Sequence, residues 1–283
     1  MTKRSDQASS PDDLAAGSPT VTLRGQVAVI TGGASGIGLA VARALDRRGC
    51  RLVIASRNPQ RVEQAVTSLG DALGVAPCDV KQPAAIEQLF ARTVDHYGQV
   101  DIVVASAGIA RSSQSARHVP SPLQALEESV WDDVVDTNLR GTFLTARAAA
   151  RLMVPRRSGQ IVGISSARAG VRGMAYGASY CASKMAARVL LEALADEVRA
   201  AGVRVFSVLP DVVETDMLAG TNLASGGALT SDQVGEYIAQ LLELPPDATV
   251  EQAQILPLGS RQRARRPRSS GTLPSAPADE SAS

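Results

Sequence analysis

Short apolar runs alternate with longer helical patterns along most of this chain. The predicted strands, each read as buried on both faces, are Gln26–Ile30, Arg51–Ala55, Ile102–Ala105, Gln160–Ile164, Val203–Val208 and Ala253–Leu256, with Val75–Cys78 as a weaker candidate. The predicted helices are Gly36–Arg48, Ala84–Tyr97, Glu128–Val154, Ser179–Ala200 and Ser231–Leu244, the last preceded by a capping box of Thr230 and Gln233. This alternation predicts an α/β fold, a doubly wound parallel sheet of about seven strands with helices on both faces.

The two ends of the chain differ in composition from its middle. Residues 1–21 are rich in Ser, Asp, Pro and Gly and have no apolar period. Residues 260–283 begin with an arginine cluster and then become rich in Ser, Pro and Ala. Both compositions are typical of disordered tails. We therefore expect a single domain over residues 22–259, which is long enough to bury a large core.

Composition argues against several classes of function. The hydrophobic fraction of 45%, the charged fraction of 20% and the net charge of +1 are ordinary for a globular protein and indicate no nucleic-acid surface. The arginines at 261–268 are interpreted as a solvated tail, with an anionic partner as the alternative. The three cysteines are scattered without the spacing of a metal site or a disulfide framework. No run is long enough to span a bilayer, and residues 1–20 lack the apolar stretch of a signal peptide. We expect a cytoplasmic chain with no metal, membrane or nucleic-acid partner.

A glycine-rich turn follows the first predicted strand and opens the first predicted helix. It reads Thr31-Gly32-Gly33-Ala34-Ser35-Gly36-Ile37-Gly38. Glycines let the backbone turn sharply and approach a diphosphate, and the helix start offers free amides and a positive dipole end. A plain loop is the alternative, but the strand–turn–helix context favours a cofactor phosphate site. The spacing, T-G-x-x-x-G-x-G, differs from the usual G-x-G-x-x-G.

Tyr180 and Lys184 are four residues apart on the predicted helix Ser179–Ala200. The chain contains only three lysines and four tyrosines, so this spacing stands out. Residues i and i+4 share a helical face, and their side chains can meet. A phenol beside an ammonium can serve as a proton donor near neutral pH. Because a free tyrosine has a pKa of ~10, this use requires a downward shift of roughly three units, or ~4 kcal/mol in favour of the phenolate.

These motifs, in this order, resemble those of the short-chain dehydrogenase/reductase family in its shorter single-domain branch. The matching motifs span residues 24–217. The resemblance implies a Rossmann-type fold and hydride transfer between a nicotinamide cofactor and a small-molecule ketone or secondary alcohol. The residues that match the family's catalytic set are Asn138, Ser166, Tyr180 and Lys184.

The resemblance implies a role for each member of this set. Tyr180 would be the general acid or base, and Lys184 would tune it and hold the nicotinamide ribose. Ser166 would hydrogen-bond the substrate oxygen, and Asn138 would hold a water that links Lys184 to solvent. The adjacent Ser165 is the rival to Ser166. Ser166 lies fourteen residues before Tyr180, one more than in many members, so we expect a loop one residue longer.

The nicotinamide cofactor favoured by the sequence is NADP(H). An acid after the second strand would bind a ribose 2′-hydroxyl and repel a 2′-phosphate, but Ser56 and then Arg57 stand there. NAD(H), with Arg57 as a plain surface residue, remains the alternative. Asp79 matches the family's adenine-contacting acid, and Val213 and Thr215 match the residues that fix the carboxamide. The full set of implied cofactor-binding residues is Gly32, Ser35, Gly36, Ile37, Gly38, Arg57, Asp79, Val80, Ala107, Gly108, Tyr180, Lys184, Val213 and Thr215.

Two motifs depart from the family pattern. Ala105-Ser106-Ala107-Gly108 stands where the family has Asn-Asn-Ala-Gly, and Asp211 replaces a glycine beside the cofactor. Both are expected to weaken cofactor binding, and they motivate the alternative of a non-catalytic NADP-binding scaffold or sensor. The glycine spacing disfavours a third possibility, a sugar-nucleotide epimerase or dehydratase of the longer branch.

The predicted helix Ser179–Ala200 also bears on assembly. Members of the family often form homodimers or homotetramers through this region. The small and apolar residues that could pack against a partner copy, or alternatively against the internal core, are Ala182, Ala186, Val189 and Ala193.

Overall fold

The computed structural model describes residues 20–110, 122–168, 171, 173–218 and 227–258. The predicted tails therefore lie outside the described residues, except for residues 20 and 21. The strands are β1 Val27–Thr31, β2 Arg51–Ala55, β3 Ala72–Val75, β4 Ile102–Ala105, β5 Gly159–Ile164, β6 Val203–Pro210, β7 Val213–Glu214, β8 Leu229–Thr230 and β9 Gln252–Ile255. The helices are α1 Gly36–Asp46, α2 Pro59–Thr67, α3 Pro83–Tyr97, α4 Glu128–Val135, α5 Gly141–Arg156, α6 Ala178–Val198 and α7 Ser231–Leu242. Short helical turns are η2 Leu123–Ala125, η3 Asp136–Arg140, η4 Arg199–Ala201 and η5 Asp216–Leu218.

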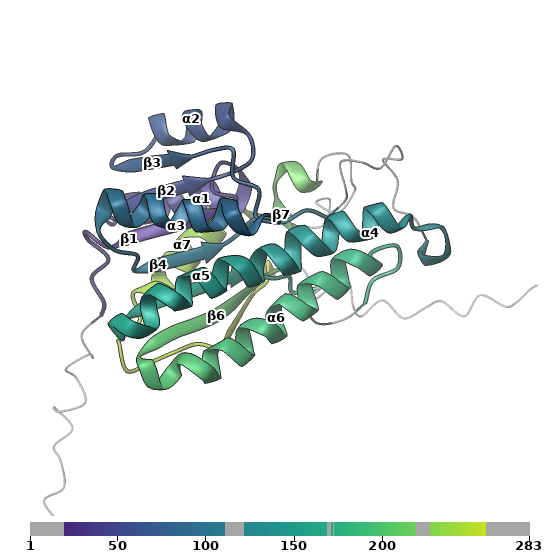
Figure 1. The fold of residues 1–283 in the computed structure, drawn as a ribbon. Coiled ribbons are helices and arrows are strands. Elements are labelled where there is room, and N and C mark those ends of the chain that lie inside the picture. Colours follow the sequence, from purple (N-terminus) through teal and green to yellow (C-terminus); the bar gives the residue numbers. More distant parts are fainter. Residues whose placement is uncertain (1–19, 111–121, 169–170, 172, 219–226, 259–283) are drawn as a thin grey trace, which may run out of the picture.

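Seven of the strands form one parallel sheet in the order β3-β2-β1-β4-β5-β6-β9 (Figure 1). The predicted fold class is confirmed. The strand order reverses between β1 and β4, which are neighbours in the sheet. Ligands of such sheets bind outside the carboxyl ends of the strands at this switch point. The short pair β7 and β8 lies apart from the main sheet.

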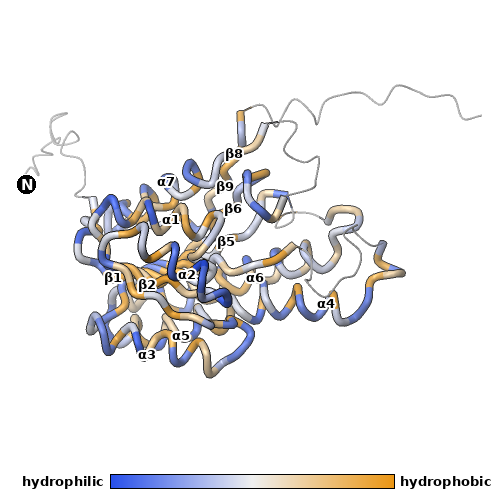
Figure 2. Tube along the Cα trace, turned by 90° about the horizontal axis from the view of Figure 1, so that it is seen from above, coloured by the Kyte–Doolittle hydropathy of each residue, from blue (hydrophilic) through white to orange (hydrophobic). Residues whose placement is uncertain are grey.

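Helices cover both faces of the sheet and divide the core in two. On β1, Ile30 packs into a cluster that includes residues of α1 and α7, whereas Val29 packs into a cluster with residues of α3, α5 and α6. Because successive strand residues point to opposite faces, both faces of β1 are apolar, and all five of its residues are buried. Figure 2 shows β1 and β2 as predominantly hydrophobic segments. The sheet is therefore a rigid layer from which the loops at its carboxyl edge project.

Several elements differ from the sequence prediction, among them the short strands β7 and β8, which were not predicted. The third strand ends at Val75 and does not run from there to Cys78, because Pro77 has no amide hydrogen to continue the ladder. The expected single helix Glu128–Val154 is divided by one π-helical turn, η3. Helix α2 was not predicted, although Pro59 stands at its first position and Asn58 caps it by accepting a hydrogen bond from the Arg61 amide at 3.0 Å.

The capping box of Thr230 and Gln233 before α7 is confirmed. Within the described ranges, no helix is long and apolar enough to cross a bilayer.

Candidate active site

The glycine-rich turn lies at the carboxyl end of β1, directly before α1. Gly32 and Gly36 have φ values of +67° and +51°, a backbone region that side chains disfavour. A Cβ atom on Gly38 would lie 2.4 Å from the carbonyl oxygen of Gly32, and one on Gly32 would lie 2.8 Å from the Cα atom of Ala107. Glycine is therefore required for the turn to close on itself and to pack against the loop after β4.

The start of α1 has the chemistry of an anion site. Ser35 occupies the N-cap position, but its side chain makes no capping hydrogen bond, and the first turn, which includes Ile37, contains no acidic residue. Uncapped amides and the positive end of the helix dipole attract phosphate groups. Together with the closely packed glycines, these features fit the diphosphate of a dinucleotide.

The loops after β2 and β3 carry the residues predicted for the adenosine end of the cofactor. Arg57 follows β2 and is exposed, so its guanidinium is accessible to a ligand. Asp79 follows β3, and its Oδ1 atom accepts a hydrogen bond from the Lys81 amide at 3.0 Å. Val80 is buried against Gly141, where a Cβ atom would lie 2.6 Å from Val80 Cγ2. These residues come from separate elements but lie at the same edge of the sheet.

Lys81 is a residue that the sequence analysis did not single out. Its Nζ atom donates to Oδ1 of the buried Asp133 at 2.9 Å and lies 4.0 Å from Asp79. The pKa of Lys81 is raised, chiefly by the hydrogen bond to Asp133, while the nearby charge of Arg57 acts in the opposite direction. Lys81 therefore ties the loop after β3 to α4 and fixes the position of Asp79. No sequence pattern connects positions 81 and 133.

Tyr180 and Lys184 lie on the same face of α6, close to the carboxyl end of β5. The Nζ atom of Lys184 is 5.9 Å from the centroid of the Tyr180 ring, and it donates a hydrogen bond to the Ile164 carbonyl at 2.7 Å. The Lys184 residue is only 6% exposed. The predicted i, i+4 pair is thus brought together on the helix, and the end of β5 anchors its lysine.

Burial dominates the acid–base properties of this pair. It lowers the pKa of Lys184 to about 8, because the ammonium is removed from water. It also raises the pKa of Tyr180, although the hydrogen bond from Ser166 acts to lower it. The protein alone therefore keeps the phenol protonated at neutral pH. The downward shift expected for Tyr180 as a general acid or base near neutral pH would require further positive charge at the site.

The two adjacent serines after β5 have different surroundings. Ser165 donates its hydroxyl to the backbone carbonyl of Lys184 at 3.0 Å and so ties β5 to α6. Ser166 hydrogen-bonds the Tyr180 side chain. The hydroxyl that shares a hydrogen bond with the phenol is therefore that of Ser166 and not that of Ser165.

Asn138 lies on the π-helical turn η3 and is buried. Its Nδ2 atom donates to the Ile109 carbonyl at 2.8 Å and to the Ser183 hydroxyl at 3.0 Å, while its Oδ1 atom accepts from the Ile109 amide at 2.8 Å. A Cβ atom on Gly108 would lie 3.1 Å from Asn138 Oδ1 and 3.2 Å from Lys184 Nζ. The loop after β4 therefore runs directly past both polar groups.

The segment after β6 returns to the glycine-rich turn. Val213 belongs to β7, which pairs with β8 through Leu229. The Cγ2 atom of Thr215 lies 3.4 Å from the position that a Cβ atom on Gly36 would occupy. Thr215, predicted to bind the nicotinamide carboxamide, thus lies close to Gly36, predicted to bind the diphosphate.

Of the two departures from the family pattern, Asp211 has a compensating partner. Its carboxylate is bound by both Nε and Nη2 of Arg168, a residue that the sequence analysis did not single out. Ser106, which replaces an amide side chain, donates its backbone amide to Val104 at 3.1 Å. A partner 43 positions away cannot be read from local sequence spacing, so only the fold reveals the Arg168–Asp211 pair.

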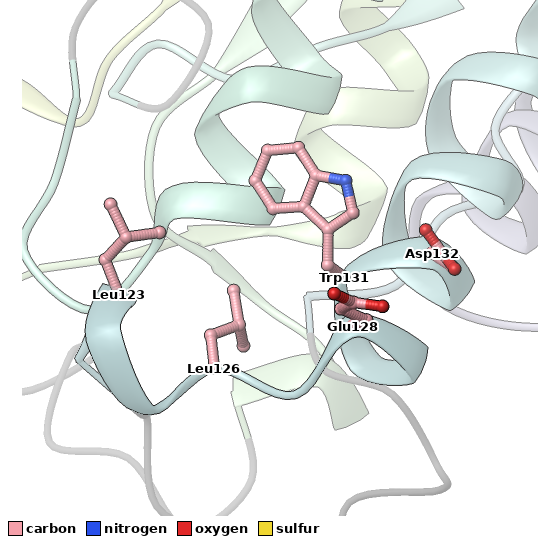
Figure 3. A pocket seen from close by; sticks show the side chains of 5 residues that line it. All are labelled: Leu123, Leu126, Glu128, Trp131 and Asp132. Atoms are coloured by element: carbon pink, nitrogen blue, oxygen red, sulfur yellow. The ribbon is translucent and has the colours of Figure 1, made fainter.

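A separate cavity of about 360 Å³ lies beside the start of α4 (Figure 3). Its lining residues are Leu123, Leu126, Glu128, Trp131 and Asp132. It contains none of the predicted catalytic or cofactor-binding residues. The candidate active site is instead the open edge of the sheet, where within the described ranges no cluster of His, Cys, Asp or Glu could hold a metal ion.

Comparison with known proteins agrees with this arrangement. A family model described as short chain dehydrogenase matches residues 26–225. An oxidoreductase of Staphylococcus epidermidis is 30% identical over 233 residues, which cover 82% of this chain and 97% of the relative. The alcohol dehydrogenase of the archaeon Thermococcus sibiricus, solved with 5-hydroxy-NADP, has a TM-score of 0.73 at 29% identity, covering 81% of this chain and 95% of the other.

A metagenomic short-chain oxidoreductase solved with NADP has a TM-score of 0.70 at 29% identity, covering 84% of this chain and 99% of the other. The family match spans well over half of the chain, and it includes the glycine-rich turn, Tyr180 and Lys184. The fold, the strand order and the relatives agree. This chain belongs to the short-chain dehydrogenase family and is a short-chain dehydrogenase/reductase enzyme.

Proposed function

We propose that this enzyme interconverts a small-molecule ketone and its secondary alcohol with NADP(H), using Tyr180 as the general acid or base. The observation that carries the proposal is the hydrogen bond between Ser166 and Tyr180 beside the buried Lys184. The three groups come from the end of β5 and from one face of α6. A substrate oxygen placed between the Ser166 hydroxyl and the phenol would be within reach of both.

The cofactor would be held along the carboxyl edge of the sheet. The glycine-rich turn and the first amides of α1 suit its diphosphate, and Asp79 and Val80 suit its adenine. Lys184 suits the nicotinamide ribose, and Val213 and Thr215 suit the carboxamide. When bound, this cofactor supplies or accepts the hydride.

The chain's own residues would handle the proton. In the reductive direction, Tyr180 donates its phenolic proton to the substrate oxygen as negative charge develops there. Ser166 stabilises that charge by donating a hydrogen bond. The Lys184 ammonium would favour the phenolate that remains. Asn138 would hold a water that resupplies the proton, with only its oxygen atoms free to do so, because both Nδ2 hydrogens are donated to Ile109 and Ser183.

Selectivity for NADP(H) over NAD(H) would rest on Arg57. This residue is exposed at the end of β2, and Ser56 before it offers no carboxylate to repel a 2′-phosphate. Two of the structural relatives were solved with NADP or an NADP derivative, in keeping with this choice.

The proposal also covers the domain organisation of the chain and its association with other copies. We propose that residues 22–259 form one catalytic domain, and that copies associate as a homodimer or homotetramer through α6. Ala182 and Ala193 are exposed on this helix and Val189 is 53% exposed, so this part of the predicted stripe is not used by the internal core.

The test is turnover of a panel of ketones and secondary alcohols with NADPH or NADP⁺, followed by nicotinamide absorbance. Tyr180→Phe is expected to lower kcat by about 100-fold or more, since positioned proton transfer contributes on that order, while the variant still binds NADPH. Tyr237→Phe, at an exposed tyrosine of α7, is the matched control and should retain full activity. Undiminished turnover by Tyr180→Phe would refute the mechanism. Tight NADPH binding without turnover of any panel member would support the scaffold or sensor alternative.

A further inference from the structure

Arg168 and Asp211 form an ion pair between the loop after β5 and the loop after β6. The Asp211 side chain is only 5% exposed, whereas that of Arg168 is 40% exposed. Two guanidinium nitrogens reach the carboxylate, Nη2 at 3.4 Å from Oδ2. A carboxylate this deeply buried is unfavourable unless it is paired. Arg168 supplies that pairing.

Two backbone hydrogen bonds, one on each side of Ser166, already connect this loop to β6. The Ser165 amide donates to the Val208 carbonyl at 2.8 Å, and the Ala167 amide donates to the Pro210 carbonyl at 2.9 Å. Ser166 lies between these two bonds, and the ion pair adds a third link one residue farther along both segments. Beyond Asp211, the chain leads directly into the segment 213–215, which is proposed to fix the nicotinamide.

Both members of the pair stand where this chain departs from the pattern of its family. Asp211 stands where the resemblance implies a glycine, and Arg168 lies in the loop between Ser166 and Tyr180, for which the resemblance predicts one additional residue. Alone, the acid would oppose an anionic cofactor, and its charge would be buried without compensation. Since the two departures meet in one ion pair, they are best explained together.

We propose that Arg168 and Asp211 are positioning residues, which hold Ser166 against the nicotinamide-binding segment and cancel the charge of the acid that lies beside the cofactor. This inference rests on the proposed function, because it concerns NADP(H) bound at the same site. Neither residue is assigned contact with the reacting atoms. Their effect is exerted through Ser166 on one side and through the segment 213–215 on the other.

The charge of the nicotinamide ring gives a specific signature for this role. The oxidised ring is cationic and the reduced ring is neutral. In Arg168→Met, the unpaired Asp211 carboxylate disfavours both cofactor forms through their phosphates but attracts the oxidised ring. In Asp211→Asn, the unpaired Arg168 has the opposite preference. A loss of packing alone would shift the affinities for NADP⁺ and NADPH together.

The experiment measures the Kd values of NADPH and NADP⁺ by titration calorimetry for the wild type, Arg168→Met, Asp211→Asn and the double variant, together with kcat/KM. Thermal unfolding verifies that each variant is folded. We expect Arg168→Met to weaken NADPH binding about tenfold, with a smaller loss for NADP⁺, the modest size reflecting the partial exposure of Arg168. We expect Asp211→Asn to shift the ratio of the two Kd values in the other direction, and the double variant to return both values to within about threefold of the wild type.

Arg199→Met is the matched control. Arg199 also forms ion pairs, with Asp196 and Glu251, but it lies in η4 before the start of β6, at the opposite end of that strand from Asp211. Its cofactor affinities should equal those of the wild type.

If the wild type binds NADP(H) and folded Arg168→Met keeps both Kd values and kcat/KM, the positioning role is overturned while the proposed function stands. If both single variants shift the two Kd values in parallel, the charge-cancelling role is overturned. If the wild type binds neither cofactor form, the proposed function fails and this inference fails with it.

Discussion

The side-chain amide of Asn138 satisfies both backbone groups of Ile109, one through each of its polar atoms. Nδ2 donates to the Ile109 carbonyl and Oδ1 accepts from the Ile109 amide, each at 2.8 Å. This two-way contact resembles the pairing of one strand with another, although it joins a helical side chain to a loop. It also places the loop after β4 beside Lys184. The altered Ala105–Gly108 motif thus retains a brace from a different part of the chain.

Asn138→Ala should therefore destabilise the protein as well as impair turnover. The substitution leaves two part-buried backbone groups without their partner, which costs about 1–3 kcal/mol for each such group. We expect a loss of about 2–6 kcal/mol in the free energy of unfolding, measured with urea, and at least a tenfold fall in kcat. Leu144→Ala, a core truncation on α5 with a similar expected cost, serves as the control and should keep its kcat. Equal losses of kcat in both variants would show that Asn138 acts through stability alone.

Gly38→Ala should abolish the close turn at the start of α1. The added Cβ atom would lie 2.4 Å from a backbone oxygen of Gly32, and backbone cannot move aside as a flexible side chain would. We expect the Kd for NADPH to rise by about tenfold or more, since the helix amides no longer reach the phosphates in the same geometry. Gly98→Ala is the matched control. Gly98 has φ +81° at the C-cap of α3, so alanine there should lower stability and leave the Kd unchanged.

The buried Lys184 should make stability depend on pH in the mildly alkaline range. Burial lowers its folded-state pKa to about 8 from 10.5, so between these values the unfolded chain binds more protons than the folded one. Stability then rises with pH across this window, by up to about 1.4 kcal/mol per pH unit. Relative to Lys184→Met, the wild type should gain about 2 kcal/mol in free energy of unfolding from pH 8 to pH 10.

This comparison with Lys184→Met isolates one group among several. The buried thiols of Cys50 and Cys78 have pKa values raised to about 12 and about 11, so they favour the unfolded state at alkaline pH. They are present in both proteins, and their contribution cancels in the difference. A difference in unfolding free energy that stays constant from pH 8 to pH 10 would contradict the burial-lowered pKa of Lys184.

Cofactor selectivity should reverse when the charges after β2 are changed. Arg57→Ala is expected to lower kcat/KM for NADPH about tenfold, because a charge-assisted contact to the 2′-phosphate is removed, and to leave kcat/KM for NADH unchanged. Ser56→Asp combined with Arg57→Ala should raise kcat/KM for NADH above that for NADPH, since the new carboxylate suits a ribose diol. Steady-state kinetics with both cofactors provides the measurement, and NADH is the internal control for Arg57→Ala. A wild type that prefers NADH would overturn the assignment of Arg57.

Much of the fold follows from local sequence pattern. β2 and β4 have the predicted bounds, because a continuous apolar run between polar turns is distinctive for a strand buried on both faces. α7 begins at the predicted residue, because Thr230 and Gln233 form a recognisable capping box. Helix α2 escaped prediction although it has Asn58 and Pro59 at its start, since only Val62 and Ala65 are buried in its nine residues and its apolar face is narrow.

In the candidate site too, local motifs could be predicted from the sequence, whereas contacts between distant segments could not. The i, i+4 spacing of Tyr180 and Lys184 and the glycine-rich turn are local, so the sequence could place them. Ser165 and Ser166 have different hydrogen-bond partners on α6. Those partners depend on where α6 packs against the sheet, which no local sequence pattern encodes. The contacts of Lys81 with Asp133 and of Arg168 with Asp211 join segments 52 and 43 residues apart, and they exist only once the strands have paired.

The last described strand also has a consequence for biosynthesis. β9 pairs with β6, and the Asp211 amide donates to the Ile255 carbonyl at 2.9 Å, just where β6 leads into the segment 213–215. While the ribosome is still holding residues beyond about 250, β6 is an unpaired edge and this segment lacks its outer support. A nascent chain can form the dinucleotide turn early, from its first hundred residues. It can complete the proposed nicotinamide end of the site only after β9 has been synthesised, and a chain truncated before Gln252 would leave β6 as an exposed sheet edge.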